Sequence, residues 1–435
     1  MDAFRRILPT AAAAVAVLSG CHNDDSTAAP RNLLLITVDT LRADHLGLYG
    51  HAGPISPRID TWGSSALVFE EAHAPSSWTL ASLASLMTSG PSSRHGCWDF
   101  KSSLDDSALV LAEVLDQQGF RTEAVASHLF LAPKFGLDQG FDDYDVELVK
   151  PLMRSHEAIS SPEVALRGVE RLERLARSED RWFLWLHFFD PHEVYHAHEG
   201  FWPQGDRGEE LDRYKSEVAF TDDGIGRVLD TLVELDLAAE TAVVLTADHG
   251  EEWLDHGALR HGHSLHRELV HVPLVLGGPG VEPGRTALPA SLVDVAPTLC
   301  DWLDVEAPGD FLGDVLPLSA GTAPGDLTDR PLLEELRLRE KRRFDGLRRG
   351  RWHLIIDRKD DSASLFDLLE DPTEQDDRAA LEPELVAELV AQLEGERARY
   401  QGSDGSSADL SADDVQRLID LGYAEPADLE GRDGD

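Results

Sequence analysis

The stretch Thr241-Ala-Val-Val-Leu-Thr-Ala-Asp-His-Gly-Glu-Glu252 decides how the rest of the chain is interpreted. Its apolar run, residues 242–245, has the length and β-branching of a buried strand. Asp248 and His249 follow, so a carboxylate and an imidazole stand side by side just past the strand. Ligands of open α/β sheets bind at that end of the strands, and Asp and His both coordinate divalent metals. We therefore expect a metal site here if other strands deliver matching groups.

Length and charge limit the classes of function. The chain has 435 residues, 42% of them hydrophobic, which suits one large domain with an appendage or two domains. Its 39 basic and 81 acidic residues give a formal net charge of −42. Phosphate contacts need a basic surface, so we expect no nucleic-acid partner. Local positive charge for an anionic substrate could come from metal ions. Three cysteines are too few for a disulfide framework.

The amino-terminal segment has the pattern of an exported lipoprotein. After a basic start, residues 7–18 form an apolar run too short to span a bilayer stably, and Leu18-Ser-Gly-Cys21 resembles a bacterial lipobox. We expect a signal peptide over residues 1–20, a lipid on Cys21 and a polar tether over residues 21–30. An ordinary signal peptide cut elsewhere is the alternative. The pattern predicts a bacterial cell-envelope protein, on the periplasmic or surface side, that touches the membrane only through this anchor.

Strand and helix patterns alternate over residues 31–330, the expected catalytic domain. We expect strands at 31–40, 120–127, 182–189, 241–246 and 272–277, and helices at 59–72, 80–87, 107–118, 161–177, 211–237 and 294–303. This alternation indicates βαβ units and an α/β fold, with a mostly parallel sheet flanked by helices.

The pattern changes after residue 330. Strand patterns at 352–356 and 365–368 and an amphipathic helix at 381–400 predict a small C-terminal α+β subdomain over residues 331–400. Residues 401–435 should hold a flexible linker at 402–408, a short helix at 412–423 and a disordered acidic tail.

Four expected strands end in groups that could bind a metal or an anion. These are Asp39, His128, Asp190 with His192, and Asp248 with His249. A single Asp after a strand can be a helix cap, but four such ends are harder to attribute to capping. Asp39, Asp248 and His249 would give one cation three ligands and leave a position open for a nucleophile, as catalytic metal sites require.

Several motifs together resemble the sulfatase family of the alkaline phosphatase superfamily. In family order they are Leu34-Leu-Ile-Thr-Val-Asp-Thr-Leu-Arg42, Phe188-Phe-Asp-Pro-His192, Thr246-Ala-Asp-His-Gly-Glu251, His271-Val-Pro-Leu-Val275, Trp352-His-Leu-Ile355 and Leu365-Phe-Asp-Leu-Leu-Glu-Asp-Pro372. The resemblance covers residues 31–400. It implies that family's fold and a divalent cation (Ca, Mn, Mg or Zn) on Asp39, Asp248 and His249, with Thr40 beside them. It also implies that His192 contacts the substrate.

The nucleophile segment departs from the family pattern. Sulfatases carry Cys or Ser, then x-Pro-Ser-Arg, and the first residue is oxidised to formylglycine; the matching stretch here is Thr79-Leu-Ala-Ser-Leu83. Threonine cannot form the aldehyde hydrate, so we expect direct attack by a metal-activated Thr79 hydroxyl, which resembles the superfamily's phosphodiesterases and phosphotransferases. A helix opening at Leu80 would offer free N–H groups to an anion. The alternative is that Thr79 only caps that helix.

A second cation is a further expectation. Where sulfatases place a lysine near the sulfate, this chain has His261 and His263. Either could join Asp190 and His192 in a second site, and two cations would clamp both oxygens of a phosphoester. The alternative is that these histidines line a loop or bind substrate singly. Arg42, His128 and His261 are the expected substrate contacts, and for Arg42 a loop-anchoring role is the alternative.

These patterns predict a metal-dependent sulfatase-family hydrolase that cleaves sulfate or phosphate esters, with Thr79 and His192 as catalytic residues. The expected substrate is a sulfated or phosphorylated small molecule or glycan. Alternatives are a phosphoester, phosphodiester or phosphonate hydrolase, a phosphotransferase acting on envelope glycans, and a homologue that binds polyanions without turnover. The intact set Asp39, Asp248 and His249 argues against the last alternative.

Overall fold

The computed structural model describes residues 29–152, 158–201, 209–321, 327–338, 342–400, 402, 405–421 and 423–426. The expected signal peptide, Cys21 and the acidic tail beyond residue 426 lie outside this part of the chain. Within it, no helix has both the length and the apolar character needed to cross a membrane.

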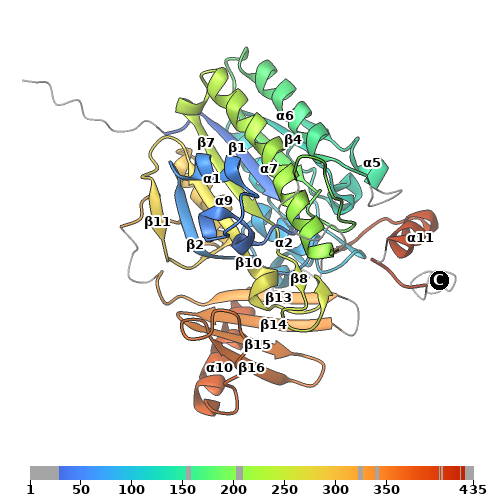
Figure 1. The fold of residues 1–435 in the computed structure, drawn as a ribbon, viewed down its shortest axis with the longest axis vertical. Coiled ribbons are helices and arrows are strands. Elements are labelled where there is room, and N and C mark those ends of the chain that lie inside the picture. Colours follow the sequence, from blue (N-terminus) through green and yellow to red (C-terminus); the bar gives the residue numbers. More distant parts are fainter. Residues whose placement is uncertain are drawn as a thin grey trace, which may run out of the picture.

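The strands before residue 330 are β1 Asn32–Val38, β2 Leu67–His73, β3 Ser102–Ser103, β4 Phe120–Val125, β5 Asp143–Asp145, β6 Arg181–Phe188, β7 Thr241–Ala247, β8 Glu252–Trp253, β9 Leu259–Arg260, β10 His271–Gly277, β11 Gly284–Thr286 and β12 Ala290–Ser291. In the described chain the largest sheet has nine strands, in the order β11-β2-β10-β7-β1-β6-β4-β5, with β12 beside β2. Strands β7, β1, β6 and β4 are mutually parallel neighbours, and β10 is antiparallel between β7 and β2. The predicted mostly parallel α/β fold is confirmed (Figure 1).

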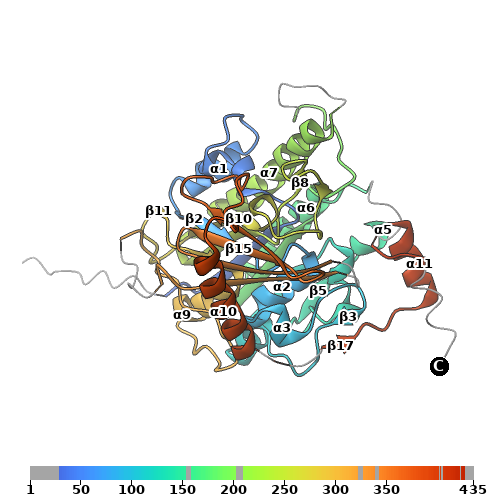
Figure 2. The ribbon, with the colours of Figure 1, turned by 90° about the horizontal axis from the view of Figure 1, so that it is seen from below.

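The helices of this part are α1 Pro57–Gly63, α2 Thr79–Thr88, α3 Ser92–His95, α4 Leu111–Gln117, α5 Val149–Leu152, α6 Ser161–Leu175, α7 Glu210–Glu234, α8 Arg267–Val270 and α9 Val295–Trp302. Figure 2 shows α1, α6 and α7 on one side of the sheet and α2, α3 and α9 on the other. Every residue of β1 and β7 is therefore buried, which explains why both strands are almost continuously apolar.

One expected helix is a strand in the structure. The helix predicted at 59–72 ends at Gly63, and Leu67–His73 forms β2. The apolar residues Leu67 and Phe69 find backbone partners in β10, opposite Leu276 and Leu274. Pairing with a strand distant in sequence outweighed the local helical pattern, as tertiary context often does.

A second, four-stranded antiparallel sheet follows, with the order β13-β14-β15-β16. Its elements are β13 Leu332–Leu338, β14 Arg342–Arg349, β15 Trp352–Asp357, β16 Ser362–Asp367 and α10 Pro383–Arg399, and α10 packs on the sheet. This is the predicted C-terminal α+β subdomain. Sequence patterns missed β13 and β14 because charged residues interrupt their apolar alternation.

Buried ion pairs join the two sheets. His353 lies between two carboxylates, with Nδ1 2.6 Å from Glu374 and Nε2 2.9 Å from Glu334. Glu334 also contacts Nδ1 of His73 on β2, at 3.0 Å. Although burial alone would lower the pKa of His353, the two carboxylates raise it to about 10. Glu334 therefore joins the two sheets through His73, and a charged His353 lies behind it in the second sheet.

The sheets also meet beside the start of α2. The backbone N–H of Glu335 on β13 donates to the carbonyl of Pro75 at 2.8 Å, four residues before Thr79. The Glu335 carboxylate in turn accepts the N–H of Ser93 at 2.8 Å. The second sheet thus braces the segments on both sides of α2.

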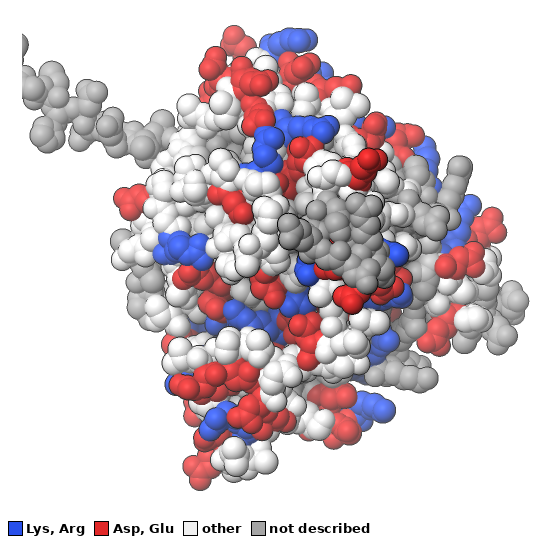
Figure 3. All heavy atoms as spheres, viewed as in Figure 1, with Lys and Arg blue, Asp and Glu red and all other residues white. Residues whose placement is uncertain are grey.

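The last described residues return to the part of the chain before residue 330. Strand β17, Ser406–Ser407, pairs with β3, and helix α11 spans Ala412–Asp420. Part of the predicted linker at 402–408 is therefore paired strand. On the face shown in Figure 3, acidic and basic side chains are interspersed.

Candidate active site

The candidate site lies where four neighbouring parallel strands end. Asp39 follows β1, His128 follows β4, His192 lies just beyond β6, and Asp248 with His249 follow β7. Because parallel neighbours present their carboxyl ends at one edge, residues far apart in sequence meet there. All of these side chains are buried.

Three of the expected metal ligands are brought together. Asp39, Asp248 and His249 offer ligand atoms that all lie within 4.8 Å of one another. Three of their carboxylate oxygens accept no hydrogen bond from the described chain: Oδ1 and Oδ2 of Asp39 and Oδ2 of Asp248. Burial, and then mutual repulsion with neighbouring carboxylates, raises the pKa of Asp39 well above its usual value. Orphaned buried carboxylate oxygens and an imidazole suit a divalent cation, so the donor set fits the metal that the motifs imply.

Thr40 belongs to the same turn. Its backbone has a φ of 53°, and its N–H donates to Oδ1 of Asp248 at 3.2 Å. The N–H of His249 donates to the same oxygen at 2.8 Å, so Oδ1 is held by the backbone while Oδ2 stays available. The Thr40 hydroxyl is buried and makes no hydrogen bond to any described residue.

Thr79 is the first residue of α2, and its hydroxyl reaches this group. Its Oγ1 lies 3.2 Å from Nε2 of His249. Nδ1 of His249 lies 2.9 Å from the carbonyl of Gly250, which can only accept, so Nδ1 carries the proton. The lone pair of Nε2 therefore faces both Thr79 and the two carboxylates.

His128 and His192 face Asp39 from the other side, and the ligand atoms of these three residues also lie within 4.8 Å of one another. Nδ1 of His128 accepts the N–H of Phe130 at 2.9 Å, so neutral His128 carries its proton on Nε2, 3.5 Å from Asp39. This makes His128 a donor rather than a metal ligand. His192 has the opposite tautomer, because its Nδ1 lies 2.7 Å from the carbonyl of Glu193.

His261 completes the ring of imidazoles. Its ring centroid is 4.5 Å from that of His249 and 5.1 Å from that of His192. Nδ1 of His261 lies 3.0 Å from Glu251, whose other oxygen accepts the hydroxyl of Tyr195 at 2.6 Å. Burial raises the pKa of Glu251 to about 7. A carboxylate thus orients His261 while its Nε2 remains on the side of the site.

The structure does not bring Asp190 and His263 to this group. Both oxygens of Asp190 are engaged at the start of α6, where they accept the N–H and hydroxyl of Ser160 and the N–H of Ser161 at 2.6 to 2.7 Å. His263 is bound through Nε2 to Glu252 at 2.7 Å. Asp190 and His263 therefore do not join His192 in the expected second cation set, whereas His261, the alternative to His263, lies beside His192.

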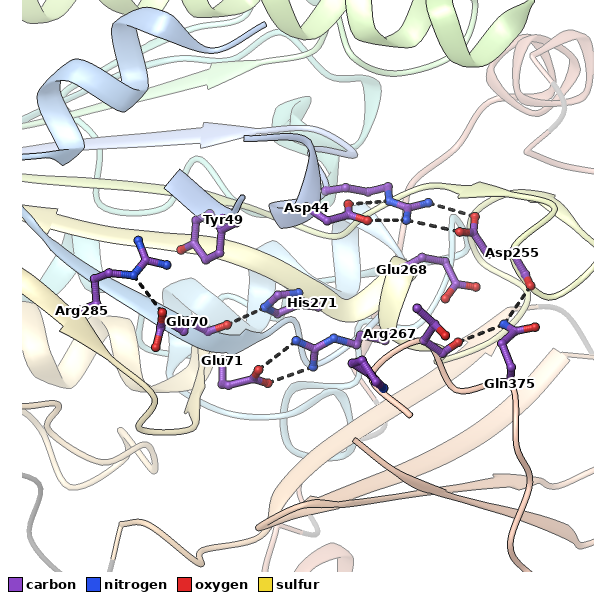
Figure 4. Close-up of a pocket in the computed structure, with 13 residues that line it drawn as sticks. Asp44, Tyr49, Glu70, Glu71, Asp255, Arg267, Glu268, His271, Arg285 and Gln375 are labelled. Carbon is purple, nitrogen blue, oxygen red and sulfur yellow. Dashed lines mark hydrogen bonds and ion pairs between the residues drawn. The ribbon is translucent and has the colours of Figure 1, made fainter. Parts of the chain in front are cut away.

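Arg42 also points away from the site, into a cavity of about 510 Å³ between the two sheets. Its guanidinium pairs with Asp44 at 2.7 Å and Asp255 at 3.0 Å and donates to the carbonyl of Glu251. Figure 4 shows further acid–base pairs lining the same cavity. This geometry matches the loop-anchoring alternative for Arg42.

Two residues near the site were not expected from the sequence. His187 on β6 faces Thr37 on β1, and its Nε2 lies 3.4 Å from Asp39. Its place inside an apolar strand gave no functional signal, although its position opposite β1 could have done so. Tyr423 places its hydroxyl 3.2 Å from Nε2 of His192. Nothing in the sequence links it to a histidine 231 residues earlier.

Comparison with known protein families gives the class to which this fold and site belong. Residues 31–305 match the family described as Sulfatase. Because the match covers more than half of the chain, the protein belongs to the sulfatase family.

Individual relatives cover parts of the chain. Human arylsulfatase K is 32% identical over 195 residues, which span 41% of this chain and 35% of that protein. Choline-sulfatase of Rhizobium meliloti (strain 1021) is 24% identical over 262 residues, or 49% of this chain and 50% of that one. Bovine arylsulfatase A is 27% identical over 361 residues, which span 68% of this chain and 69% of that protein. The match therefore spans only about a third of arylsulfatase K.

Solved structures share the fold. The phosphonate monoester hydrolase of Agrobacterium radiobacter superposes with a TM-score of 0.72 at 19% identity, covering 85% of this chain and 96% of that one. Ps i-CgsB, solved with k-i-k-neocarrahexaose, superposes with a TM-score of 0.72 at 17% identity. The superposition covers 93% of this chain and 100% of that one. At these identities the likeness concerns the fold alone.

Proposed function

We propose that the protein is a metal-dependent hydrolase that cleaves a phosphate, phosphonate or sulfate ester through Thr79. The observation that carries this proposal is the position of the Thr79 hydroxyl, 3.2 Å from His249, in a site where both oxygens of Asp39 and Oδ2 of Asp248 lack a hydrogen-bond partner in the described chain. Asp39, Asp248 and His249 would hold one divalent cation. When bound, that cation would lower the pKa of a hydroxyl and offset charge on the transferring oxygens.

The chain's own residues have complementary tasks in this reaction. Oγ1 of Thr79 gives its proton to solvent and attacks the phosphorus or sulfur atom, the bond to the ester oxygen breaks, and the group passes to Thr79. His128 donates its Nε2 proton in a hydrogen bond to the transferring anion. His261, oriented by Glu251, is placed to protonate the departing alkoxide. Water then hydrolyses the ester on Thr79 and restores its hydroxyl.

The nucleophile favours phosphorus over sulfur. Sulfatases use the second hydroxyl of a formylglycine hydrate to expel sulfate, and Thr79 has only one hydroxyl. A phosphothreonine intermediate can instead be hydrolysed by attack of water at phosphorus. We therefore place phosphoesters and phosphonates first and sulfate esters second. The expected substrate carrier is a small molecule or an envelope glycan, and transfer of the group to a glycan hydroxyl would use the same first step.

A substrate panel tests the proposal. Purified protein, loaded in turn with Ca²⁺, Mn²⁺, Mg²⁺ and Zn²⁺, would be assayed with para-nitrophenyl sulfate, phosphate, phenylphosphonate and bis-para-nitrophenyl phosphate. Thr79→Ala should lower kcat by about 10³-fold or more, whereas Thr79→Ser, which keeps a hydroxyl, should retain part of the activity. Full activity in Thr79→Ala would disprove the role of Thr79. Metal binding without turnover of any ester would favour the polyanion-binding alternative.

We propose also that the enzyme is anchored in the bacterial cell envelope by a lipid on Cys21. The proposal rests on the basic start, the apolar run and the Leu18-Ser-Gly-Cys21 segment. Cells expressing the full chain and fed an alkyne-tagged palmitate should give a labelled protein in the membrane fraction. Cys21→Ala should remove the label and leave a protein with an unprocessed signal peptide.

A further inference from the structure

The C-terminal strap, which we define as residues 405–421 with 423–424, lies on the catalytic part of the chain. Ser406 and Ser407 pair with β3, and the N–H of Ala408 donates to the carbonyl of Lys101 at 2.8 Å. Val415 and Leu418 of α11 are buried in the main core. Figures 1 and 2 both show α11 close to α5 and away from α10. The strap is thus an attachment to the candidate active site rather than a part of the second sheet.

Tyr423 of the strap lies inside the site. The Tyr423 ring packs against Phe130 and Trp78, with centroids 5.0 and 5.6 Å away, and only 6% of the residue is exposed. Nδ1 of His192 is the protonated nitrogen, since it faces the carbonyl of Glu193. The Tyr423 hydroxyl must therefore donate to Nε2 of His192, 3.2 Å away. The lone pair that His192 could offer to a substrate or a metal is already taken.

With the strap in place the reacting groups have little contact with solvent. Asp39, Asp248 and His249 are fully buried, Thr79 is 1% exposed and His192 is 3% exposed. Such burial suits a site that an ester enters when a covering element moves. The strap is a suitable element because its outer side is held by a two-residue strand pair and by the ion pair between Lys134 and Asp414 at 2.8 Å. Its movement would also expose the apolar face of α11 that is buried in the closed state.

We propose that the strap is a gate over the active site and that Tyr423 is its latch. In the closed state Tyr423 occupies His192, and substrate binds only after the strap has moved away. Substrate and latch therefore compete for the same imidazole. The proposal rests on the proposed function, and within it on the expectation from the sequence motifs that His192 contacts the substrate. A gate that is closed for most of the time raises the apparent KM by the inverse of the open fraction.

Kinetics of Tyr423→Phe test the latch, because phenylalanine keeps the ring and removes only the hydroxyl. Loss of one hydrogen bond from the closed state should lower KM by about 3- to 10-fold, with kcat not reduced. A lower kcat at unchanged KM would assign Tyr423 to the chemistry and overturn the gate. Unchanged kcat and KM would overturn it as well.

The ion pair offers a second test far from the reacting atoms. Lys134→Asp or Asp414→Lys alone should lower KM in the same way, and the double variant Lys134→Asp/Asp414→Lys should restore the KM of the parent protein. Gln416→Ala, on the exposed face of α11, is the matched control and should change neither constant. If the double variant behaves as the sum of the singles, the pair does not hold the gate.

Hydrogen–deuterium exchange separates this proposal from the proposed function, because it needs no turnover. Amides of α11 in the parent protein should exchange at least about 100-fold faster than those of β1, and Lys134→Asp should accelerate α11 further while leaving β1 unchanged. Protection of α11 equal to that of β1 would overturn the gate even in an active enzyme. Rapid exchange in a protein that turns over no ester would support the gate and leave only the proposed function refuted.

Discussion

Nδ1 of His128 accepts the backbone N–H of Phe130 at 2.9 Å, and this single contact fixes what the opposite nitrogen can do. Nε2 must carry the proton in the neutral ring, so it can donate to an anion but cannot offer a lone pair to a cation. The difference between His128 and His249, both at strand ends, thus comes from their backbone partners and not from their residue type.

His128→Gln should therefore leave metal content unchanged and lower kcat/KM by about 10- to 100-fold, because an anion contact is lost. His249→Gln should lose the metal itself. Elemental analysis of both purified variants, next to their ester kinetics, makes the comparison. Loss of metal in His128→Gln would contradict the tautomer assigned here.

Asp39→Asn should abolish metal binding and activity but make the metal-free protein more stable, by about 1–3 kcal/mol. Its carboxylate is fully buried, accepts no hydrogen bond from the described chain and has a strongly raised pKa. Urea unfolding in the presence of a chelator measures the gain. Adding metal should stabilise only the parent protein, since the ligand binds its folded state alone. An Asn variant that keeps the metal would show that Asp39 is not a ligand.

Asp190→Ala should behave as a lost helix cap. The carboxylate satisfies two backbone N–H groups and one hydroxyl at the start of α6, so its removal should cost about 2–3 kcal/mol of unfolding free energy. Metal stoichiometry should remain that of the parent protein. A drop in bound metal would instead indicate that Asp190 is a metal ligand, as the sequence pattern predicted.

The buried contacts of His353 with Glu334 and Glu374 predict how stability changes with pH. Its pKa in the folded protein, about 10, lies above the ordinary value of 6.5, so the charged form stabilises the fold. This contribution is complete below pH about 6.5, declines as pH rises, and is lost above about 10. The pKa of Glu374 is held well below its ordinary value of 4.5, chiefly by His353, so its contribution is lost on the acid side.

Urea unfolding between pH 6 and 10.5 would measure this loss, and His353→Gln is the matched control because it removes the titrating group. The variant should be less stable at neutral pH, and its unfolding free energy should fall less than that of the parent protein as the pH rises toward 10.5. Parallel pH profiles for the two proteins would mean that His353 is neutral in the folded state.

The sequence predicted the parts of the site that follow strand ends. Buried parallel strands are continuous apolar runs, so the positions of Asp39, Asp248 and His249 at their ends could be read directly. Side-chain direction could not: Asp190 follows a strand just as Asp39 does, yet its carboxylate turns to α6. The strand β2 could not be told from a helix because its partner β10 is distant in sequence: His271 of β10 contacts Glu70 of β2, 201 residues earlier. The role of Tyr423 could not be predicted for the same reason, since only tertiary folding brings it to His192.

The hydrogen bond from Glu335 to Pro75 bears on how the protein can be dissected. A gene fragment ending near residue 330 would encode every strand of the large sheet in its proper order. It would nevertheless lack Glu335, which holds the segment before Thr79, and Glu334, the buried carboxylate partner of His73. Such a fragment should form the large sheet and still be inactive. The two sheets therefore make up a single functional domain, and the second sheet cannot be removed without loss of activity.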